Sequence, residues 1–247
     1  MRIERNGPVA LLRMENGKAN AISAALLERL DALIGQLGDA RAAVITGQGS
    51  AFCAGLDLPP LVDLDRATMR GFIRRFDEVM MRIFELPIPL IAAVNGHAVA
   101  GGCVLALQAD VRIGADRDSR IGLNETRLGI GLPAAVAETL RWQVPGSSLA
   151  PLALEGRLVS PREALALGLL HELVSEKDLL SRALERAAEL AALPPAGLRM
   201  VKQSLRRPAA AAARATEDNE AERWLDTWFS PESRRRLQEA VARLKKS

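Results

Sequence analysis

Apolar strand-like runs that alternate with amphipathic helical stretches constrain the fold of this 247-residue chain more than any other feature. The runs RAAVITG (41–47), PLIAAV (89–94) and VRIGA (111–115) are almost wholly apolar, which is typical of strands buried on both faces of a sheet. Residues 20–38 and 65–87, which precede the first two runs, carry apolar side chains at helical spacing. The alternation continues to about residue 175 and predicts an α/β fold with partly parallel sheets.

The rest of the chain has a helical pattern only. We expect four helices, over residues 176–192, 195–206, 209–229 and 231–245, the last with Ser230 as N-cap and Pro231 in its first turn. The run RRPAAAAARA is a shift in composition and predicts either a hinge or a change of packing partner between two of these helices. We therefore divide the chain into a core over residues 1–192 and a helical region over 193–247. This region is expected to pack on a neighbouring subunit or to fold back over the core.

Composition excludes several classes of protein. The net charge is only +3 and tyrosine is absent, so the chain has little with which to attract and stack nucleic-acid bases. No apolar run is long enough for a membrane span and the first residues lack a signal-peptide core, so we expect a cytoplasmic protein without membrane insertion. Cys53, Cys103, His97 and His171 show no metal-binding or disulfide spacing, and we expect the cysteines to be buried thiols.

Two glycine-rich turns follow buried strands, GQGSAFCAGLDL (47–58) and VNGHAVAGGCVLA (94–106). Glycine allows the backbone to approach a ligand closely, and the second turn leads into a helix whose N-terminus favours negative charge. Two backbone N–H groups that converge on one oxygen would form an oxyanion hole. Neither turn matches the phosphate-binding glycine patterns, and each alone is equally well explained as an ordinary strand-to-helix connection.

The stretch SRIGLNETRLGIG (119–131) contains a single carboxylate, Glu125, among Ile121, Leu123, Leu128 and Ile130. The pattern alone favours a surface glutamate at the end of a strand. A buried glutamate in the same apolar surroundings would have a raised pKa and could act as a general base.

The stretches GSAFCAGLDL, AAVNGHAVAGGCVLALQADVRI and IGLNETRLG, in this order, resemble the crotonase superfamily, also called the enoyl-CoA hydratase/isomerase family. As a set they are most similar to mitochondrial-type Δ3-Δ2-enoyl-CoA isomerases. The resemblance extends from GKANAIS (17–23) to the last helix. It implies a spiral of ββα units followed by a C-terminal helical region, and a homotrimer or dimer of trimers. It also implies an acyl-CoA thioester substrate and no cofactor beyond the CoA of that substrate.

The resemblance also assigns roles to residues. The backbone N–H groups of Leu56 and Gly101 correspond to the oxyanion hole that binds the thioester carbonyl, and Glu125 corresponds to a catalytic glutamate. Asn124 either positions that glutamate, touches the thioester or only forms a turn. We expect Asp57 to cap local backbone rather than act as a base. The expected substrate-binding positions are Ala19, Ala54, Gly55, Asp57, Leu58 and Asn124.

One departure from the family pattern bears on the reaction. The hydratases of the family hold a water between two glutamates, and the position of the first is occupied here by Val104. Glu138, the nearest later acid, is read as an ordinary helix residue. A valine can neither hold water nor move a proton, whereas one carboxylate is enough to move a proton from C2 to C4 of a 3-enoyl-CoA. The sequence therefore predicts an isomerase with Glu125 as its single acid/base.

Three alternatives stay open at this point: a weak hydratase, another acyl-CoA reaction such as hydrolysis or decarboxylation, and a non-catalytic member that binds acyl-CoA or RNA. The basic runs Arg206-Arg207, Arg234–Arg236 and Lys245-Lys246 are expected on solvated helix faces, and one of them is a candidate for contact with the CoA phosphates.

Overall fold

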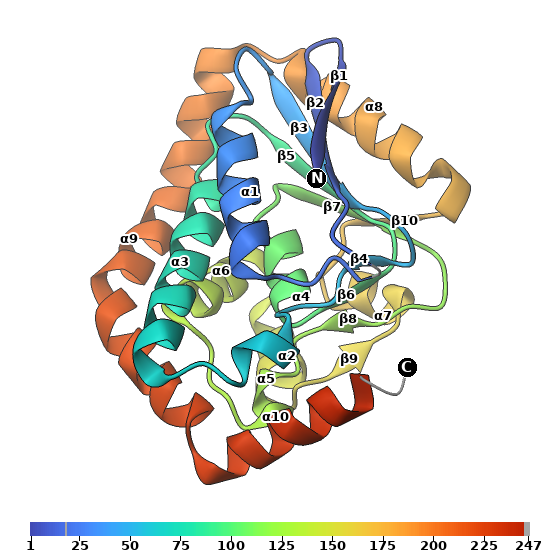
Figure 1. The fold of residues 1–247 in the computed structure, drawn as a ribbon. Helices are drawn as coiled ribbons and strands as arrows, with labels where there is room; N and C mark the ends of the chain where they lie inside the picture. The colour runs from blue at the N-terminus through green and yellow to red at the C-terminus, as the bar shows by residue number, and fades with distance from the viewer. Residues whose placement is uncertain (18, 245–247) are drawn as a thin grey trace.

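The computed structural model of the protein describes residues 1–17 and 19–244. Its larger sheet has six strands in the order β1-β2-β3-β5-β7-β10, parallel except for the β1–β2 hairpin (Figure 1). These strands are β1 (Arg2–Asn6), β2 (Val9–Met14), β3 (Ala42–Gly47), β5 (Leu90–Val94), β7 (Val111–Ala115) and β10 (Glu172–Val174). The smaller sheet contains β4 (Ala51–Cys53), β6 (His97–Val99), β8 (Ile121–Gly122) and β9 (Leu158–Val159), with only the β8–β9 pair antiparallel.

The chain winds as a spiral because each successive turn gives one strand to each sheet and then a helix. β3 and β4 precede α2 (Leu58–Leu61) and α3 (Arg66–Phe84), and β5 and β6 precede α4 (Gly101–Leu107). β7 and β8 precede α5 (Glu125–Leu128). In the first turn, β2 is followed by an isolated bridge between Ile22 and Leu56 and then by α1 (Ala24–Gly35). The α/β class and the ββα spiral predicted from the sequence are confirmed.

Helices cover both faces of the larger sheet, which explains why its central strands are apolar throughout. On one face α8 (Leu179–Ala191) packs through Ala183, Ala187 and Ala191, whose small side chains let it lie close to β3 and β5. The other face meets the main core, which includes residues of α1, α3 and α4. The remaining short elements are α6 (Ala134–Gln143), η1 (Gly146–Ser148), η2 (Ala150–Leu154), α7 (Pro161–Ala166) and η3 (Glu176–Asp178).

The predicted hinge in the C-terminal region is wrong, because α9 (Pro195–Trp228) runs as one helix of 34 residues past Pro208. Ala209, Ala210 and Ala213 are buried against Met81 and Phe84 of α3 and Ala135 of α6. Alanine has the highest helix propensity, and its small side chain allows this close packing. The packing offsets the loss of one backbone hydrogen bond at the proline.

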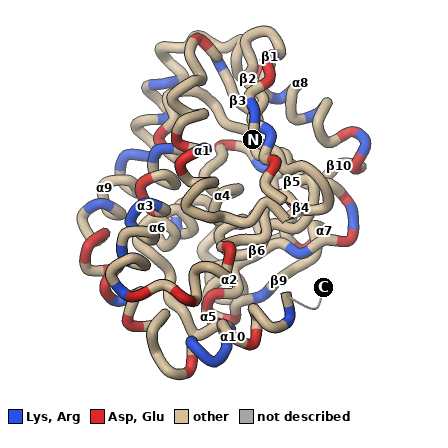
Figure 2. The backbone as a smooth tube through the Cα atoms, viewed as in Figure 1, with Lys and Arg blue, Asp and Glu red and all other residues tan. Residues whose placement is uncertain are grey.

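The last helix is α10 (Pro231–Leu244), and the expected N-cap is confirmed because the Ser230 hydroxyl accepts a hydrogen bond from the Ser233 N–H at 3.2 Å. α9 runs beside α3, and α10 closes the opposite end from the β1–β2 hairpin (Figure 1). Acidic and basic residues are interspersed along α3, α9 and α10, whereas α4 carries neither (Figure 2). In residues 1–17 and 19–244, no helix is long and apolar enough to cross a membrane.

One of the basic runs differs from its predicted setting. Arg206 is buried, not solvated: its guanidinium pairs with Asp110 at 2.7 Å and donates to the carbonyl of Gln108 at 2.9 Å. Lys202 also donates to Asp110, at 2.7 Å. The contacts of Lys202 and Arg206 with Asp110 thus connect α9 to the end of the core where β5 and β7 begin. Lys245-Lys246 lies outside the described residues.

Candidate active site

The two glycine turns meet where the second ends and α4 begins. A Cβ atom placed on Gly55 would lie 3.4 Å from the Gly101 nitrogen, and one on Gly102 would lie 1.9 Å from the Cys53 carbonyl oxygen. No side chain fits at Gly102, so glycine there allows the first turn of α4 to sit directly on the end of β4. The strand order of the smaller sheet thus brings together two segments that are about fifty residues apart in sequence.

Two backbone N–H groups at this junction have no acceptor in residues 1–17 and 19–244. The neighbours of Leu56 are bonded to Ile22, since Gly55 O accepts from Ile22 N at 2.7 Å and Asp57 N donates to Ile22 O at 3.0 Å. Leu56 N–H itself has no acceptor among the described residues, and neither has Gly101 N–H, which begins α4. Ala100 has φ 50° and ψ −122°, an unfavourable conformation for a residue with a side chain. Such strain is common where a backbone must hold a functional group in place.

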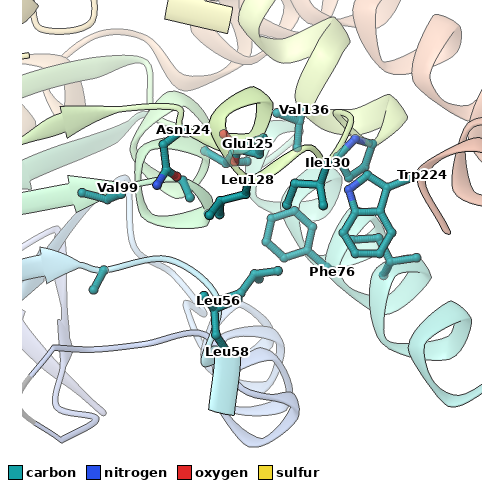
Figure 3. Close-up of a pocket in the computed structure, with 16 residues that line it drawn as sticks. Leu56, Leu58, Phe76, Val99, Asn124, Glu125, Leu128, Ile130, Val136 and Trp224 are labelled. Carbon is teal, nitrogen blue, oxygen red and sulfur yellow. The ribbon is translucent and has the colours of Figure 1, made fainter. Parts of the chain in front are cut away.

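Leu56 and Gly101 line one pocket, which has about 610 Å³ of unfilled space, part of it open to solvent. In Figure 3, Val99 and Asn124 lie at one end of the view and Phe76 and Trp224 at the other, with Glu125 and Leu128 between them. Most of the lining is apolar and comes from the side chains of Leu56, Leu58, Ile73, Phe76, Val99, Val104, Leu128, Ile130, Val136 and Trp224.

Glu125 is the first residue of α5 and is only 8% exposed. Burial disfavours its charged form and raises the pKa of the carboxyl to about 7, although nearby backbone N–H groups oppose the shift. Its Oε2 atom and the Oδ1 atom of Asn124 have no hydrogen-bond partner among the described residues. Both residues line the pocket, so a bound ligand could supply the missing partners.

Among the described residues that line the pocket, Glu125 is the only carboxylate, and Val104 lines the same space. Glu138 is not in this lining; it lies on α6 and pairs with Arg141 one turn later. The reading of Glu138 as an ordinary helix residue agrees with this position. The pocket thus combines one carboxylate of raised pKa with two free backbone N–H groups in mostly apolar surroundings.

The structure brings most of the residues expected at the site together. Ala54, Leu56, Leu58, Gly101, Asn124 and Glu125 all line the pocket. Gly55 lies in the chain between the lining residues Ala54 and Leu56, and the Ala19 carbonyl accepts a hydrogen bond from Ala54 N at 3.0 Å, so both adjoin the pocket without lining it. Asp57 occupies the N-cap position of α2, but its side chain makes no capping hydrogen bond, contrary to expectation.

The cysteines and histidines show no catalytic arrangement. Cys53 and Cys103 are fully buried, and burial raises the pKa of each thiol to about 12, so neither is a ready nucleophile. His97 is the first residue of β6, and its ring accepts a hydrogen bond from the Arg120 N–H at 3.1 Å. In the part of the chain that the structure describes, no group of three or more His, Cys, Asp or Glu could hold a metal ion.

Sequence reasoning missed the residues that form the far wall of the pocket: Ile73 and Phe76 of α3, Pro133 and Val136 beside and on α6, and Trp224 of α9. Their helical spacing resembles that of core residues, so the pattern does not distinguish a core contact from a pocket wall. Trp224 carried the one available signal, since it is a large aromatic residue within the polar stretch EAERWLDTW.

The spiral of ββα units and its pair of free N–H groups define the class of α/β proteins with the crotonase fold. The chain matches the family model described as enoyl-CoA hydratase/isomerase over residues 4–245. It belongs to this family.

The relatives of this chain include proteins named as isomerases and proteins named as hydratases. The chain is 31% identical over 243 residues to the human mitochondrial enoyl-CoA delta isomerase 1, covering 96% of this chain and 80% of that protein. It is 38% identical over 187 residues to a putative enoyl-CoA hydratase of Thermus thermophilus, covering 73% of this chain and 71% of that one. Among solved structures, human mitochondrial delta3-delta2-enoyl-CoA isomerase superposes with a TM-score of 0.94 at 29% identity, covering 99% of this chain and 98% of that one.

Proposed function

We propose that this protein is an enoyl-CoA isomerase that moves the double bond of a 3-enoyl-CoA to the 2-position. The observation that carries the proposal is that the described lining of the pocket holds one carboxylate, with Val104 where a hydratase would need a second one. Hydration requires one group to activate water at C3 and another to supply a proton at C2. Isomerisation requires only that one base take a proton from C2 and return it to C4.

The reaction starts with Glu125 ionised and the thioester oxygen at the N–H groups of Leu56 and Gly101. The carboxylate takes a proton from C2, and the electrons of that C–H bond move toward the thioester to give a dienolate. The two N–H groups stabilise the charge on the oxygen, each by about 3–4 kcal/mol. The protonated carboxyl then gives its proton to C4, and the double bond comes to lie between C2 and C3.

The pocket suits this chemistry in two further ways. A pKa of about 7 places the carboxyl of Glu125 close to neutral pH, where a group can both accept and return a proton efficiently. General base catalysis of this kind is typically worth about 10²–10⁴-fold in rate. The mostly apolar walls offer few hydrogen-bond partners to water that would compete for the proton.

The substrate and assembly expected for the family form part of the proposal. We infer that the substrate is an acyl-CoA thioester, that the acyl chain lies between Leu56 and Trp224, and that residues Ala19 and Ala54–Leu58 border the CoA path. We also infer a homotrimer or dimer of trimers, with residues 193–247 as the region that helps to build it. Trp142, Val201 and Leu205 are exposed around one groove beside α9 and form a candidate contact surface.

A labelled substrate tests the single-base mechanism. With a 3-enoyl-CoA that carries deuterium at C2, one carboxylate should deliver part of the label to C4, which mass spectrometry of the product can locate. Glu125→Gln should abolish both turnover and label transfer. Turnover that survives Glu125→Gln, or a product that never retains the label at C4, would argue for a different or a second base.

A further inference from the structure

The segment that follows Glu125 is held by the C-terminal end of the chain. α5 has only four residues, too few to be stable without outside contacts. Residues 127–131, which are the last two residues of α5 and the three that follow, lie against the pocket and are called loop 127–131 below. Thr126 and Arg127 attach one side of this segment to the carbonyls of Ala153 and Glu155 at 2.5 and 2.9 Å. The other side is bound by residues about one hundred positions later.

Three hydrogen bonds connect this loop to α9 and α10. Gly131 N donates to the Thr227 hydroxyl at 3.0 Å, the Ser233 hydroxyl donates to Gly129 O at 2.7 Å, and the Arg236 guanidinium donates to Arg127 O at 3.0 Å. They contact three successive parts of the loop.

The Ser233 contact is buried and geometrically defined. Ser233 is fully buried, and its hydroxyl also accepts a hydrogen bond from the Ser230 hydroxyl at 2.9 Å. Gly129 has φ 78°, and a Cβ atom there would lie 2.7 Å from the Ser233 hydroxyl oxygen. Glycine is therefore required at this position for two reasons: the positive φ of the backbone and the close approach of α10.

The same helices also contact the other parts of the pocket. The Thr227 hydroxyl donates to the Trp224 carbonyl at 2.7 Å, and Trp224 lines the pocket on the side away from Asn124 (Figure 3). α10 packs against both α2, which follows Leu56, and α5, which begins with Glu125. The C-terminal helices therefore contact both the segment that follows Leu56 and the segment that begins with Glu125.

We propose that Thr227 and Ser233 are positioning residues, whose hydroxyls hold loop 127–131 so that the Glu125 carboxylate stays aimed into the pocket. The inference rests on the proposed role of Glu125 as the base, and adds that the C-terminal helices of the same subunit set its geometry. A misplacement of about 1 Å of a reacting group can cost a hundredfold in rate. Loss of either hydroxyl should therefore act on the rate of proton transfer, because neither residue lines the acyl pocket.

The test compares Ser233→Ala and Thr227→Val with wild type. Each variant should lower kcat about 10–100-fold, with KM little changed, and Thr227→Ser should restore most of the rate because it keeps the hydroxyl. Thr216→Val is the matched control, since Thr216 is an exposed threonine of α9 whose hydroxyl bonds only to its own helix, at 3.1 Å from Ala212 O. The kcat is measured for whichever reaction the wild type performs, isomerisation or hydration. The positioning role of Thr227 and Ser233 is then tested even if the protein is not an isomerase.

Two readouts separate positioning from general loss of stability. The loosened loop should admit water to Glu125, so the acid limb of the kcat profile should move to lower pH in Thr227→Val but not in Thr216→Val. Amide hydrogen exchange in residues 125–131 should accelerate by tenfold or more, also when no substrate is present. Unchanged amide exchange in residues 125–131 would overturn the proposal. Faster exchange with an unchanged kcat and pH profile would overturn it as well, and so would a failure of Thr227→Ser to recover activity.

Discussion

At the scale of single residues, the surroundings of Glu125 give its carboxyl a higher pKa than it would have in water. Glu125 lies among apolar side chains, one of its oxygens has no hydrogen-bond partner in the described part of the chain, and burial raises its pKa to about 7. Because the base must be ionised, kcat/KM should fall about tenfold for each pH unit below 7 and level off above it. A profile of kcat/KM against pH checks this. An acid limb near pH 4.5 would show that the working carboxyl is exposed to solvent.

The burial of Glu125 should also lower the free energy of unfolding at neutral and alkaline pH. Its pKa is higher in the folded chain than the ordinary value of 4.5, so the free energy of unfolding falls as pH rises from about 4.5 through 7. At pH 8.5 the penalty is about 3 kcal/mol. Glu125→Gln should thus be inactive but more stable than wild type at pH 8.5, and similar to it near pH 4. Denaturant unfolding at both values tests this, and a variant less stable at pH 8.5 would contradict it.

At the scale of elements, α9 contributes both to the fold and to the pocket. Trp224 is 3% exposed and stacks on Trp228 with ring centroids 5.0 Å apart, which fixes the wall at that end. Trp224→Leu should leave room for more methylene groups, each worth about 0.8 kcal/mol of burial. The ratio of kcat/KM for long over short 3-enoyl-CoA chains should rise. Trp142→Leu is the control, because Trp142 is half exposed and outside this pocket; an equal change in both variants would rule out Trp224 as the wall.

The continuity of α9 through Pro208 predicts an effect on stability. Pro208 is exposed, so alanine there removes no buried contact and restores a backbone N–H for the helix. Alanine is favoured over proline inside a helix by about 3 kcal/mol. The unfolded chain becomes more flexible without the proline, which lowers this gain in stability by about 1 kcal/mol. Pro208→Ala should therefore raise the melting temperature, whereas Gln203→Ala, also exposed on α9, should change it little. A hinge at Pro208 would give no increase.

At the scale of the whole molecule, the sequence predicted the layers better than the site. Strands such as β3 are mostly apolar because both faces of the larger sheet are covered, and that cause can be read from composition alone. The glycine turns and Glu125 were predictable because their motifs are local. The wall at Trp224 and the bonds from Thr227 and Ser233 were not, because they depend on how a distant helix folds back. The fully helical run through Pro208 depends on tertiary packing that local pattern does not express.

Assembly belongs to the same scale. The exposed apolar side chains of Val201 and Leu205, 59% and 55% exposed, are the natural place for contact between subunits in the proposed trimer. A charge at such a contact would be buried without a partner, so Val201→Glu with Leu205→Glu should dissociate the assembly to monomers. Sedimentation equilibrium measures this, with Leu154→Glu as a control at an exposed leucine outside the groove. A wild type that is monomeric at all concentrations would contradict the prediction.

The most direct test of the central claim is ultraviolet absorbance of the pure protein incubated with a trans-3-enoyl-CoA and, separately, with a trans-2-enoyl-CoA. Conjugation of the double bond with the thioester raises the absorbance, and hydration of a conjugated bond lowers it. The account predicts a rise with the first substrate, lost in Glu125→Gln, and little change with the second. A rapid fall with the second substrate would contradict it, because water would then be activated in a pocket where Val104 stands in place of a second carboxylate.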